Sequence, residues 1–398
     1  MTIKINGSSQ HEGLCFSPAG FENTVFIIDC ISTAYAVAIL AKGRAIHCIY
    51  ECKEITWRKA DYVTLFDFIL SDVQFLSKKV VFVPHPYLPP SRNPFVRIAR
   101  QMNFARLIRR RHPLDPKFTY VSSIVSSLLI GSKRQVKYVL IDEGIGSVVA
   151  RNRLSFRGDR FSERLKIALG DRVLSFQFPN RTPQISLTND THPSIVKNLD
   201  YRKFTSSAFK ASLVRLHALM QGRKCNVLVL LKGPSPGIAG HQNEEDGYSH
   251  HYDDFNIRGI LEYRDRLPKG LSPTFFLKSH PSLGNSSGKL KGLLSRLEHH
   301  GLTVYDALNY IDFDEASSLP AEGLLRYLPF NNILALDASS LLWNVAYWGD
   351  VDCYLPLNEI INFSYFEGGI YTELYELQEK INILSGKTVN FFDFKDIR

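Results

Sequence analysis

The sequence has few cysteines, six in 398 residues. They are scattered along the chain as Cys15, Cys30, Cys48, Cys52, Cys225 and Cys353. So small a set excludes a disulfide framework and is typical of a reducing compartment. The closest two, Cys48 and Cys52, stand beside His47, but no second Cys/His pair follows at zinc spacing. We therefore expect no bound metal.

The sequence also lacks the long hydrophobic run of a membrane span. The apolar stretch from Thr24 to Ala41 approaches that length, but Asp29 interrupts it and small residues fill its second half. This pattern predicts a buried strand followed by a helix. The first residues, MTIKINGSSQHEG, lack the apolar core of a signal peptide. On these grounds we expect a cytoplasmic protein.

Negative charge is scarce in one region of the chain. From Arg92 to Lys166 the sequence has 17 Lys and Arg against 5 Asp and Glu, whereas the whole chain has a net charge of +9. The basic residues form two clusters: Arg97, Arg100, Arg106, Arg109, Arg110 and Arg111, then Arg151, Arg153, Arg157, Arg160, Arg164 and Lys166. Because guanidinium groups bind carboxylates and phosphates in a bidentate way, the clusters favour a polyanion track. The alternative is a solubilising surface, and no zinc-finger, RRM, KH or helix-turn-helix pattern favours nucleic acid.

Alternating strand and helix patterns predict an α/β fold. In the first half, the apolar runs TVFII, AIHCIY, VVFV and VKYVLI alternate with helical patterns such as Tyr62–Leu76 and Pro94–Arg110. A second series follows, with the strands CNVLVLL, TFFLK, LTVY, NNILALD and DCYLP. Its helices are expected near Ile257–Arg266, Lys289–His299, Ala321–Leu328 and Ser339–Tyr347.

The irregular stretch from Gln177 to Tyr201 separates the two series and is the expected linker. We accordingly assign residues 1–190 to an N-terminal Rossmann-like domain and residues 191–398 to a C-terminal one. In such sheets ligands bind beyond the carboxyl ends of the strands. Motifs that directly follow strands are therefore the first candidates for a site.

An acidic motif closes the last predicted strand of the first series. In VLIDEGIGS, Asp142, Glu143 and Gly144 follow an apolar run. A carboxylate at this place can act as a general base on a hydroxyl, a role typically worth about 10²- to 10⁴-fold in rate. An ordinary acidic turn before glycine is the alternative.

A His-Pro dipeptide follows a strand of the second series. In FFLKSHPS, His280 and Pro281 come directly after the apolar run, where the imidazole could donate to a leaving phosphate. His85, His112 and His192 also precede prolines, and His85 follows a strand-like run as well. Strand context therefore leaves two candidates, which only the order of the motifs separates.

Two further loops of the second series could approach a phosphate. Ser339 and Ser340 follow the strand NNILALD at an expected helix start, where hydroxyls and free amides bind anions or simply cap the helix. The loop LLKGPSPG brings Gly233 after a strand, but it lacks the ending of a P-loop and the spacing of a dinucleotide fingerprint. An ordinary Pro/Gly turn is the alternative there.

The order of these motifs resembles that of the bacterial sialyltransferases. With the basic track, the chain is most similar to the bacterial polysialyltransferases, which build capsular polysialic acid. The motifs span Asp142 to Ser340, about half of the chain, and they are specific only as a set. The resemblance implies a GT-B fold, two Rossmann-like domains facing across a cleft. Residues 1–190 would bind the acceptor, and residues 191–398 would bind the donor, CMP-sialic acid.

The resemblance also implies roles for single residues. Glu143 would be the general base, with Asp142 as the alternative, and His280 the acid or electrostatic stabiliser of the departing phosphate. The donor would be bound by Pro281, Ser339, Ser340, Glu322 in the segment LPAEGLL, and Gly233. The leaving group has a single phosphate, so we expect no metal ion and no other cofactor, and a direct displacement with inversion.

The expected product is capsular polysialic acid, with α-2,8 linkage. Because each sugar of that polymer carries a carboxylate, Arg151, Arg153, Arg157 and Arg160 would bind an oligosialic acid, polysialic acid or sialylated glycolipid acceptor. The basic face would also permit peripheral attachment to the inner membrane. Two alternatives stay open: a single-addition lipooligosaccharide sialyltransferase, and a non-enzymatic polyanion-binding protein.

Overall fold

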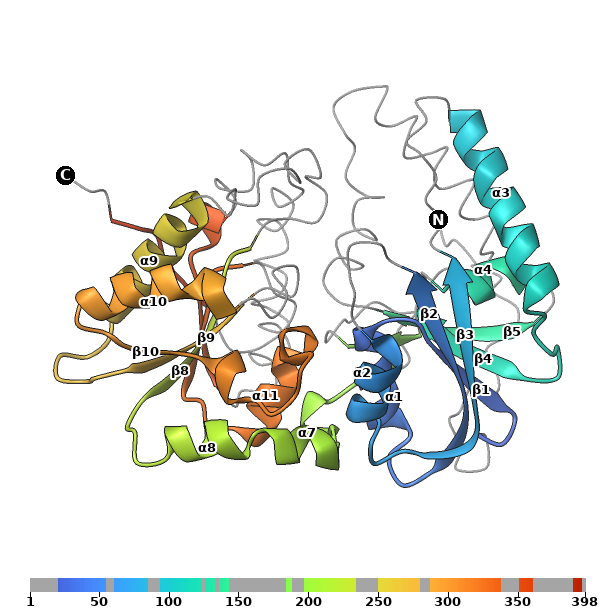
Figure 1. Cartoon of the computed structure of the whole chain (residues 1–398), viewed down its shortest axis with the longest axis horizontal. Coiled ribbons are helices and arrows are strands. Elements are labelled where there is room, and N and C mark those ends of the chain that lie inside the picture. The colour runs from blue at the N-terminus through green and yellow to red at the C-terminus, as the bar shows by residue number, and fades with distance from the viewer. Residues whose placement is uncertain are drawn as a thin grey trace, which may run out of the picture.

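A computed structural model describes most of both series of elements. The described residues are 21–54, 61–84, 94–123, 126–132, 136–142, 184–187, 197–233, 250–279, 287–337, 351–360 and 389–395. They form two parallel β-sheets with helices around each (Figure 1). The α/β class expected from the sequence is therefore confirmed, with one sheet for each series of strands.

The first sheet has the strand order β3-β2-β1-β4-β5-β6-β7. Its strands are β1 (Thr24–Ile28), β2 (Ala45–Glu54), β3 (Gln74–Pro84), β4 (Thr119–Ser123), β5 (Lys137–Asp142), β6 (Ile185–Ser186) and β7 (Lys197–Asn198). All neighbouring pairs are parallel. The chain order reverses direction between β1 and β4, which makes the ends of these two strands the topological switch point.

Helices cover both faces of the first sheet. They are α1 (Ile31–Leu40), α2 (Tyr62–Ile69), α3 (Pro94–Arg111) and α4 (Ser127–Ser132). Alternate residues of β1 point to opposite faces: Phe26 and Ile28 pack in the core with α1 and α2, whereas Val25 and Ile27 pack with α3 and α4. This alternation is the period-two pattern of a strand buried on both sides.

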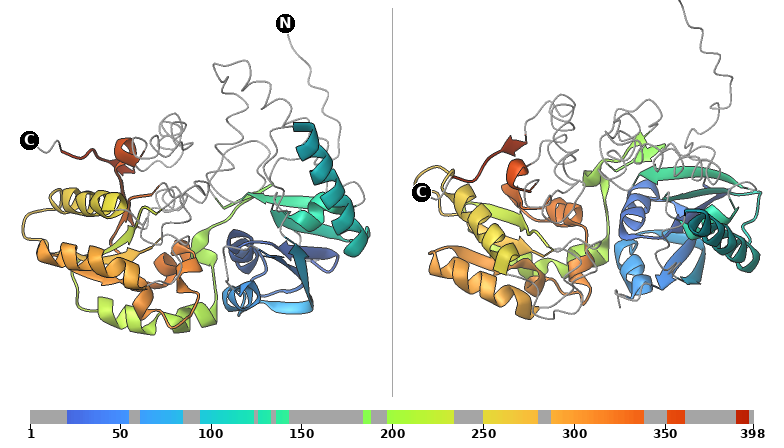
Figure 2. Two further views of the ribbon diagram at one scale, coloured as in Figure 1. Left: turned by 45° about the horizontal axis from the view of Figure 1, so that its top comes forward. Right: turned by 90° about the horizontal axis from the view of Figure 1, so that it is seen from above.

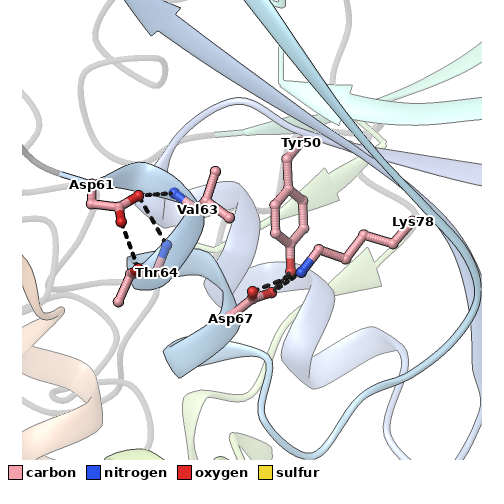
Figure 3. Close-up of polar contacts among 6 residues, drawn as sticks. All are labelled: Tyr50, Asp61, Val63, Thr64, Asp67 and Lys78. Atoms are coloured by element: carbon pink, nitrogen blue, oxygen red, sulfur yellow. Dashed lines mark hydrogen bonds and ion pairs between the residues drawn. The ribbon is translucent and has the colours of Figure 1, made fainter.

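Helix α2 shows how local sequence sets an element boundary (Figure 3). The carboxylate of Asp61 caps its first turn, accepting from the amides of Val63 and Thr64 at 3.1 and 3.2 Å and from the Thr64 hydroxyl at 2.6 Å. Further along the helix, Asp67 accepts from the Tyr50 hydroxyl at 2.8 Å and pairs with Lys78 at 2.5 Å. These contacts fix α2 against β2 and β3.

The second sheet repeats the same winding order, β10-β9-β8-β11-β12-β13. Its strands are β8 (Asn226–Leu230), β9 (Thr274–Lys278), β10 (Thr303–Asp306), β11 (Asn332–Ala335), β12 (Asp352–Leu355) and β13 (Asn390–Phe391), all parallel. The helices are α7 (Ser207–Ser212), α8 (Val214–Met220), α9 (His250–Arg264), α10 (Ser287–His299) and α11 (Ala321–Tyr327), and the short 3-10 turns are η2 (Tyr201–Lys203), η5 (Ala307–Tyr310) and η6 (Ala316–Ser318). The switch point lies between β8 and β11.

Each sheet and the helices around it form one body of the molecule. The segment from β7 to α7 runs between the two bodies, as both views of Figure 2 show. Ser206 anchors it: its hydroxyl donates to the Phe68 carbonyl at 2.8 Å, while its amide donates to the Tyr327 hydroxyl at 2.9 Å. Beside these contacts the rings of Phe68 and Phe313 stack with centroids 3.8 Å apart. Around this segment, hydrogen bonds and ring stacking therefore join the first body to the second.

Some details differ from the predicted elements, and the helix expected near Ser339–Tyr347 lies outside the described residues. The helix expected over Tyr62–Leu76 ends at Ile69, because the chain turns and Gln74 already pairs in the edge strand β3. The stretch Gln177–Tyr201, expected to be a linker, contributes β6 and β7 to the first sheet. Strand β4, with the sequence TYVSS, has no counterpart among the predictions because it is short and half polar.

In the part of the chain that the structure describes, no helix combines the length and the apolar character needed to cross a bilayer.

Candidate functional site

Most of the predicted site residues lie outside the described residues. These are Glu143, His280, Pro281, Ser339, Ser340, Arg151, Arg153, Arg157 and Arg160. Gly233 and Glu322 are described, and so is Asp142, the first residue of the acidic motif and the alternative base; Ser279 and Asp337, which lie just before the other two motifs, are described as well. The structure therefore gives the strand ends from which the motifs continue.

Buried carboxylates lie on several strands of the first sheet, and one of them, Asp29, lies at its switch point. Asp29 directly follows β1 and is buried; it accepts from the Ser123 hydroxyl at the end of β4 at 2.6 Å and from the Thr33 hydroxyl in α1 at 2.9 Å. Its carboxylate thus bridges the two strands that diverge there. These hydrogen bonds compensate part of the cost of burying its charge.

A second buried carboxylate, Glu51 in β2, lies one position beyond the Ile28–Tyr50 pair of β1 and β2. It accepts from the amides of Ser127 and Leu128 at 2.7 and 3.2 Å and from the Ser126 hydroxyl at 2.7 Å. Glu51 therefore binds the free amides at the start of α4, a structural role with a clear physical cause.

Asp142 ends β5 and is almost fully buried. The hydroxyl of Ser186 in β6 donates to its carboxylate at 3.5 Å, since Asp142 and Ser186 are register partners. A carboxylate enclosed in this way faces a neighbouring strand. It is poorly placed to accept a proton from a large bound molecule.

Lysines occupy the corresponding edge of the second sheet. Lys232 lies two residues beyond β8, and its fully buried ammonium pairs with the carboxylate of Asp337 beyond β11 at 3.4 Å. Gly233 comes next and is buried too. The predicted donor loop therefore starts at the switch point, where nucleotides bind in Rossmann-type sheets.

A second buried lysine, Lys278, is the last residue of β9 and lies two positions before His280. Its ammonium donates to the Ser317 carbonyl at 3.3 Å. Burial lowers the pKa of Lys278 to about 8, an effect that the nearby Glu322 carboxylate opposes. Burial likewise raises the pKa of Glu322, in the first turn of α11. The two groups therefore influence each other electrostatically near the end of β9.

Glu322 also links the two bodies electrostatically. Burial raises the pKa of the Tyr35 phenol in α1, and the Glu322 carboxylate raises it further. The Tyr35 hydroxyl donates to the Tyr201 carbonyl at 3.3 Å. Glu322 is the one predicted donor-binding carboxylate that the structure describes, and it lies where α11 meets the first body.

The basic cluster on α3 forms an exposed surface. Phe104 and Ile108 pack into the core, whereas four arginines of the helix are exposed: Arg106, Arg109, Arg110 and Arg111. The structure pairs none of these four with a carboxylate among the residues that it describes. Close by, burial and then the charges of Lys79 and Arg111 lower the pKa of His112. Such a surface has a strong local positive field.

Sequence reasoning did not select Asp29, Glu51, Lys232 or Lys278 as candidates. Each is a charged residue inside or at the end of an otherwise apolar run, as in VLVLLKG and TFFLKS. That context is the signal that could have identified them, since charged side chains are rarely buried without a partner.

The described residues contain no group of three His, Cys, Asp or Glu side chains placed to hold a metal ion. Comparison with protein-family models gives no match for this chain, and comparison with curated proteins gives none either. What the chain does must therefore be inferred from its own residues.

Proposed function

We propose that this chain is an inverting glycosyltransferase of the GT-B type that transfers sialic acid from CMP-sialic acid to a growing polysialic acid chain. One observation carries the proposal. The acidic motif continues from β5 of the first sheet, whereas the His-Pro and Ser-Ser motifs continue from β9 and β11. These two strands flank β8 on either side in the second sheet.

The general base in this proposal is Glu143. The neighbouring Asp142 is enclosed against Ser186. It therefore supports the assignment by elimination, because a base must lie within hydrogen-bond reach of the hydroxyl that it deprotonates. The acceptor oxygen forms a bond to the anomeric carbon of sialic acid as its proton passes to Glu143.

The leaving group in this proposal is CMP, and its stabilisation falls to the second sheet. The bond from the anomeric carbon to the phosphate oxygen breaks with its electron pair, so negative charge accumulates on the phosphate. His280, Pro281, Ser339 and Ser340 would surround that phosphate. Hydrogen-bond donors that are fixed where negative charge develops often make the largest single contribution to catalysis.

Glu322 and Gly233 complete the donor site of the proposal. Burial raises the pKa of the Glu322 carboxyl, and either of its protonation states can bind a ribose hydroxyl. Gly233 has no side chain, which permits a ligand to approach its backbone. Gly233 lies beyond β8 and Glu322 lies in the first turn of α11, so both belong to the second body, as the donor role requires.

The acceptor would bind along the basic region of the first body. The exposed arginines of α3 support this part of the proposal, together with the predicted acceptor residues Arg151, Arg153, Arg157 and Arg160. A sialic acid polymer presents one carboxylate per sugar, and a row of guanidinium groups binds such spaced anions with a strong salt dependence. We further propose α-2,8 linkage, and peripheral attachment to the inner membrane through the same basic face.

The test is a transfer assay with purified protein. CMP-sialic acid and a fluorescent disialylated lactoside are incubated in EDTA, and the products are separated by anion-exchange chromatography. A ladder of products supports the proposal. Addition of a single residue would instead indicate a lipooligosaccharide-type sialyltransferase, and neither transfer nor hydrolysis, with tight salt-sensitive polyanion binding, would indicate a binding protein.

A further inference from the structure

The switch point of the second sheet holds an ion pair that no part of the proposed reaction uses. Strands β8 and β11 pair up to Leu230 and Ala335, and the last backbone bond between them runs from the Leu336 amide to the Leu230 carbonyl at 2.9 Å. One step further the chains diverge. There the ammonium of Lys232 and the carboxylate of Asp337 lie 3.4 Å apart and bridge the gap.

The backbone of Lys232 is fixed as firmly as its side chain. The buried side chain of Asn256 in α9 accepts from the Lys232 amide at 2.9 Å and donates to the Lys232 carbonyl at 3.2 Å. Helix α9 can come this close because it carries Gly259, where a Cβ atom would lie 2.5 Å from Leu336. The residue that starts the loop is therefore held from both the helix and the neighbouring strand.

The two side chains of the pair differ in their exposure to solvent. The Lys232 side chain is 1% exposed and that of Asp337 is 15% exposed. A well-packed pair of apolar residues would stabilise such a place at least as well as a buried ion pair, so its presence is poorly explained by stability alone. Ion pairs of this kind serve best where one arrangement of two segments must be selected.

The segments in question are the two predicted phosphate-binding loops. Gly233 follows Lys232 directly, and Ser339 follows Asp337 by two residues. We propose that Lys232 and Asp337 are positioning residues, whose ion pair holds the ends of β8 and β11 at the spacing that binding of one phosphate of a cytidine nucleotide beside Gly233 requires. This inference rests on the proposed function, and it adds a residue pair that touches neither substrate nor product.

The test compares nucleotide affinity with stability in a set of variants. Lys232→Met and Asp337→Asn each remove one charge, and the double variant Lys232→Met/Asp337→Leu replaces the pair by apolar groups. Lys78→Met, which breaks the Lys78–Asp67 pair of the first sheet, is the matched control. CMP affinity is measured by calorimetry, Tm by thermal unfolding, and kcat and KM for CMP-sialic acid in the transfer assay.

We expect each single variant to weaken CMP binding and raise the donor KM at least tenfold, with a smaller change in kcat. The double variant should recover Tm but not affinity, while Lys232→Arg should recover part of the affinity. Lys78→Met should leave CMP binding unchanged.

Two results would overturn the inference alone: single variants that bind CMP like the wild type, or a double variant that regains affinity together with Tm. A wild-type chain that does not bind CMP would overturn the proposed function, and the inference with it.

Discussion

The two sheets have the same strand order, but the buried charged residues at their carboxyl edges differ in sign. At the first edge, Asp29, Glu51 and Asp142 are carboxylates bound by hydroxyls and backbone amides. At the second edge, Lys232 and Lys278 are buried ammonium groups that face carboxylates and carbonyls. Repeated topology therefore determines where a site can lie, while the residues at the strand ends decide its chemistry.

This difference agrees with the division of labour in the proposed reaction. An acceptor hydroxyl must lose a proton, which a carboxylate can take. The anionic sugar nucleotide instead needs hydrogen-bond donors and positive charge at its phosphate. The first body also carries the exposed arginines of α3. In the proposed reaction its acidic edge serves proton transfer, and its basic surface binds the polymer.

The largest expected effect comes from replacing the proposed catalytic group at each of the two edges. Glu143→Gln and His280→Ala should each lower kcat by about 10²- to 10⁴-fold, because each removes a group that transfers or stabilises charge in the transition state. The transfer assay measures this, with circular dichroism as the check on folding. Asp142→Asn is the control: it should retain most of kcat, and a loss as great as that of Glu143→Gln would reassign the base.

The next effect is a pH dependence specific to the second edge. The pKa of Lys278 falls from its ordinary value to about 8 on folding, so between pH 8 and 10.5 the unfolded chain binds the proton more strongly than the folded chain. Stability contributed at Lys278 therefore rises with pH over this window, by about 3 kcal/mol at most.

Urea unfolding of the wild type and of Lys278→Met, from pH 7 to 10, isolates this contribution. The free energy of unfolding of the wild type should rise relative to that of the variant as pH increases above 8. Parallel curves would mean that Lys278 keeps an ordinary pKa and that burial at this edge is looser than described.

At the first edge the expected effect is on stability alone. Glu51→Gln places an amide donor against the amides of Ser127 and Leu128, and it should lower the free energy of unfolding by about 2 kcal/mol. Denaturant unfolding measures the loss, and CMP affinity should stay at its wild-type value. A variant that loses CMP affinity would show that the two edges are not chemically separate.

The smallest effect concerns the basic surface. Arg109→Ala/Arg110→Ala and Arg153→Ala/Arg157→Ala should weaken binding of long oligosialic acids several-fold at low salt and less at high salt, with little change for short acceptors. Kinetics on acceptors of defined length measure this. Arg215→Ala, an exposed arginine of the second body, is the control, and equal activity of the variants on all acceptor lengths would count against the polyanion track.

Much of the fold follows from local pattern in the sequence. Strands with continuous apolar runs, such as TVFII and TFFLK, are confirmed, because burial on both faces leaves an unmistakable composition. The short strands β4, β6 and β7 escaped prediction because two to five residues with polar side chains carry no period. The end of α2 escaped because the pattern of the edge strand β3 continues that of the helix.

Site residues could be proposed from the sequence only where a motif follows a strand. The acidic, His-Pro and Ser-Ser motifs stay predictions, whereas Lys232 and Lys278 became visible once the register had brought their strands together. Single sequences do not reveal such partners, because Lys232 and Asp337 are 105 positions apart. Their pairing depends on the strand order, which local sequence does not encode.

The most direct test of the central claim is a map of amide hydrogen exchange with and without CMP, using UMP as the comparison nucleotide. We expect CMP to slow exchange at the ends of β8 and β11, around Lys232 and Asp337, and to leave exchange at the ends of β1 and β4 unchanged. Protection confined to the first sheet, or no protection at either sheet at saturating CMP, would contradict it.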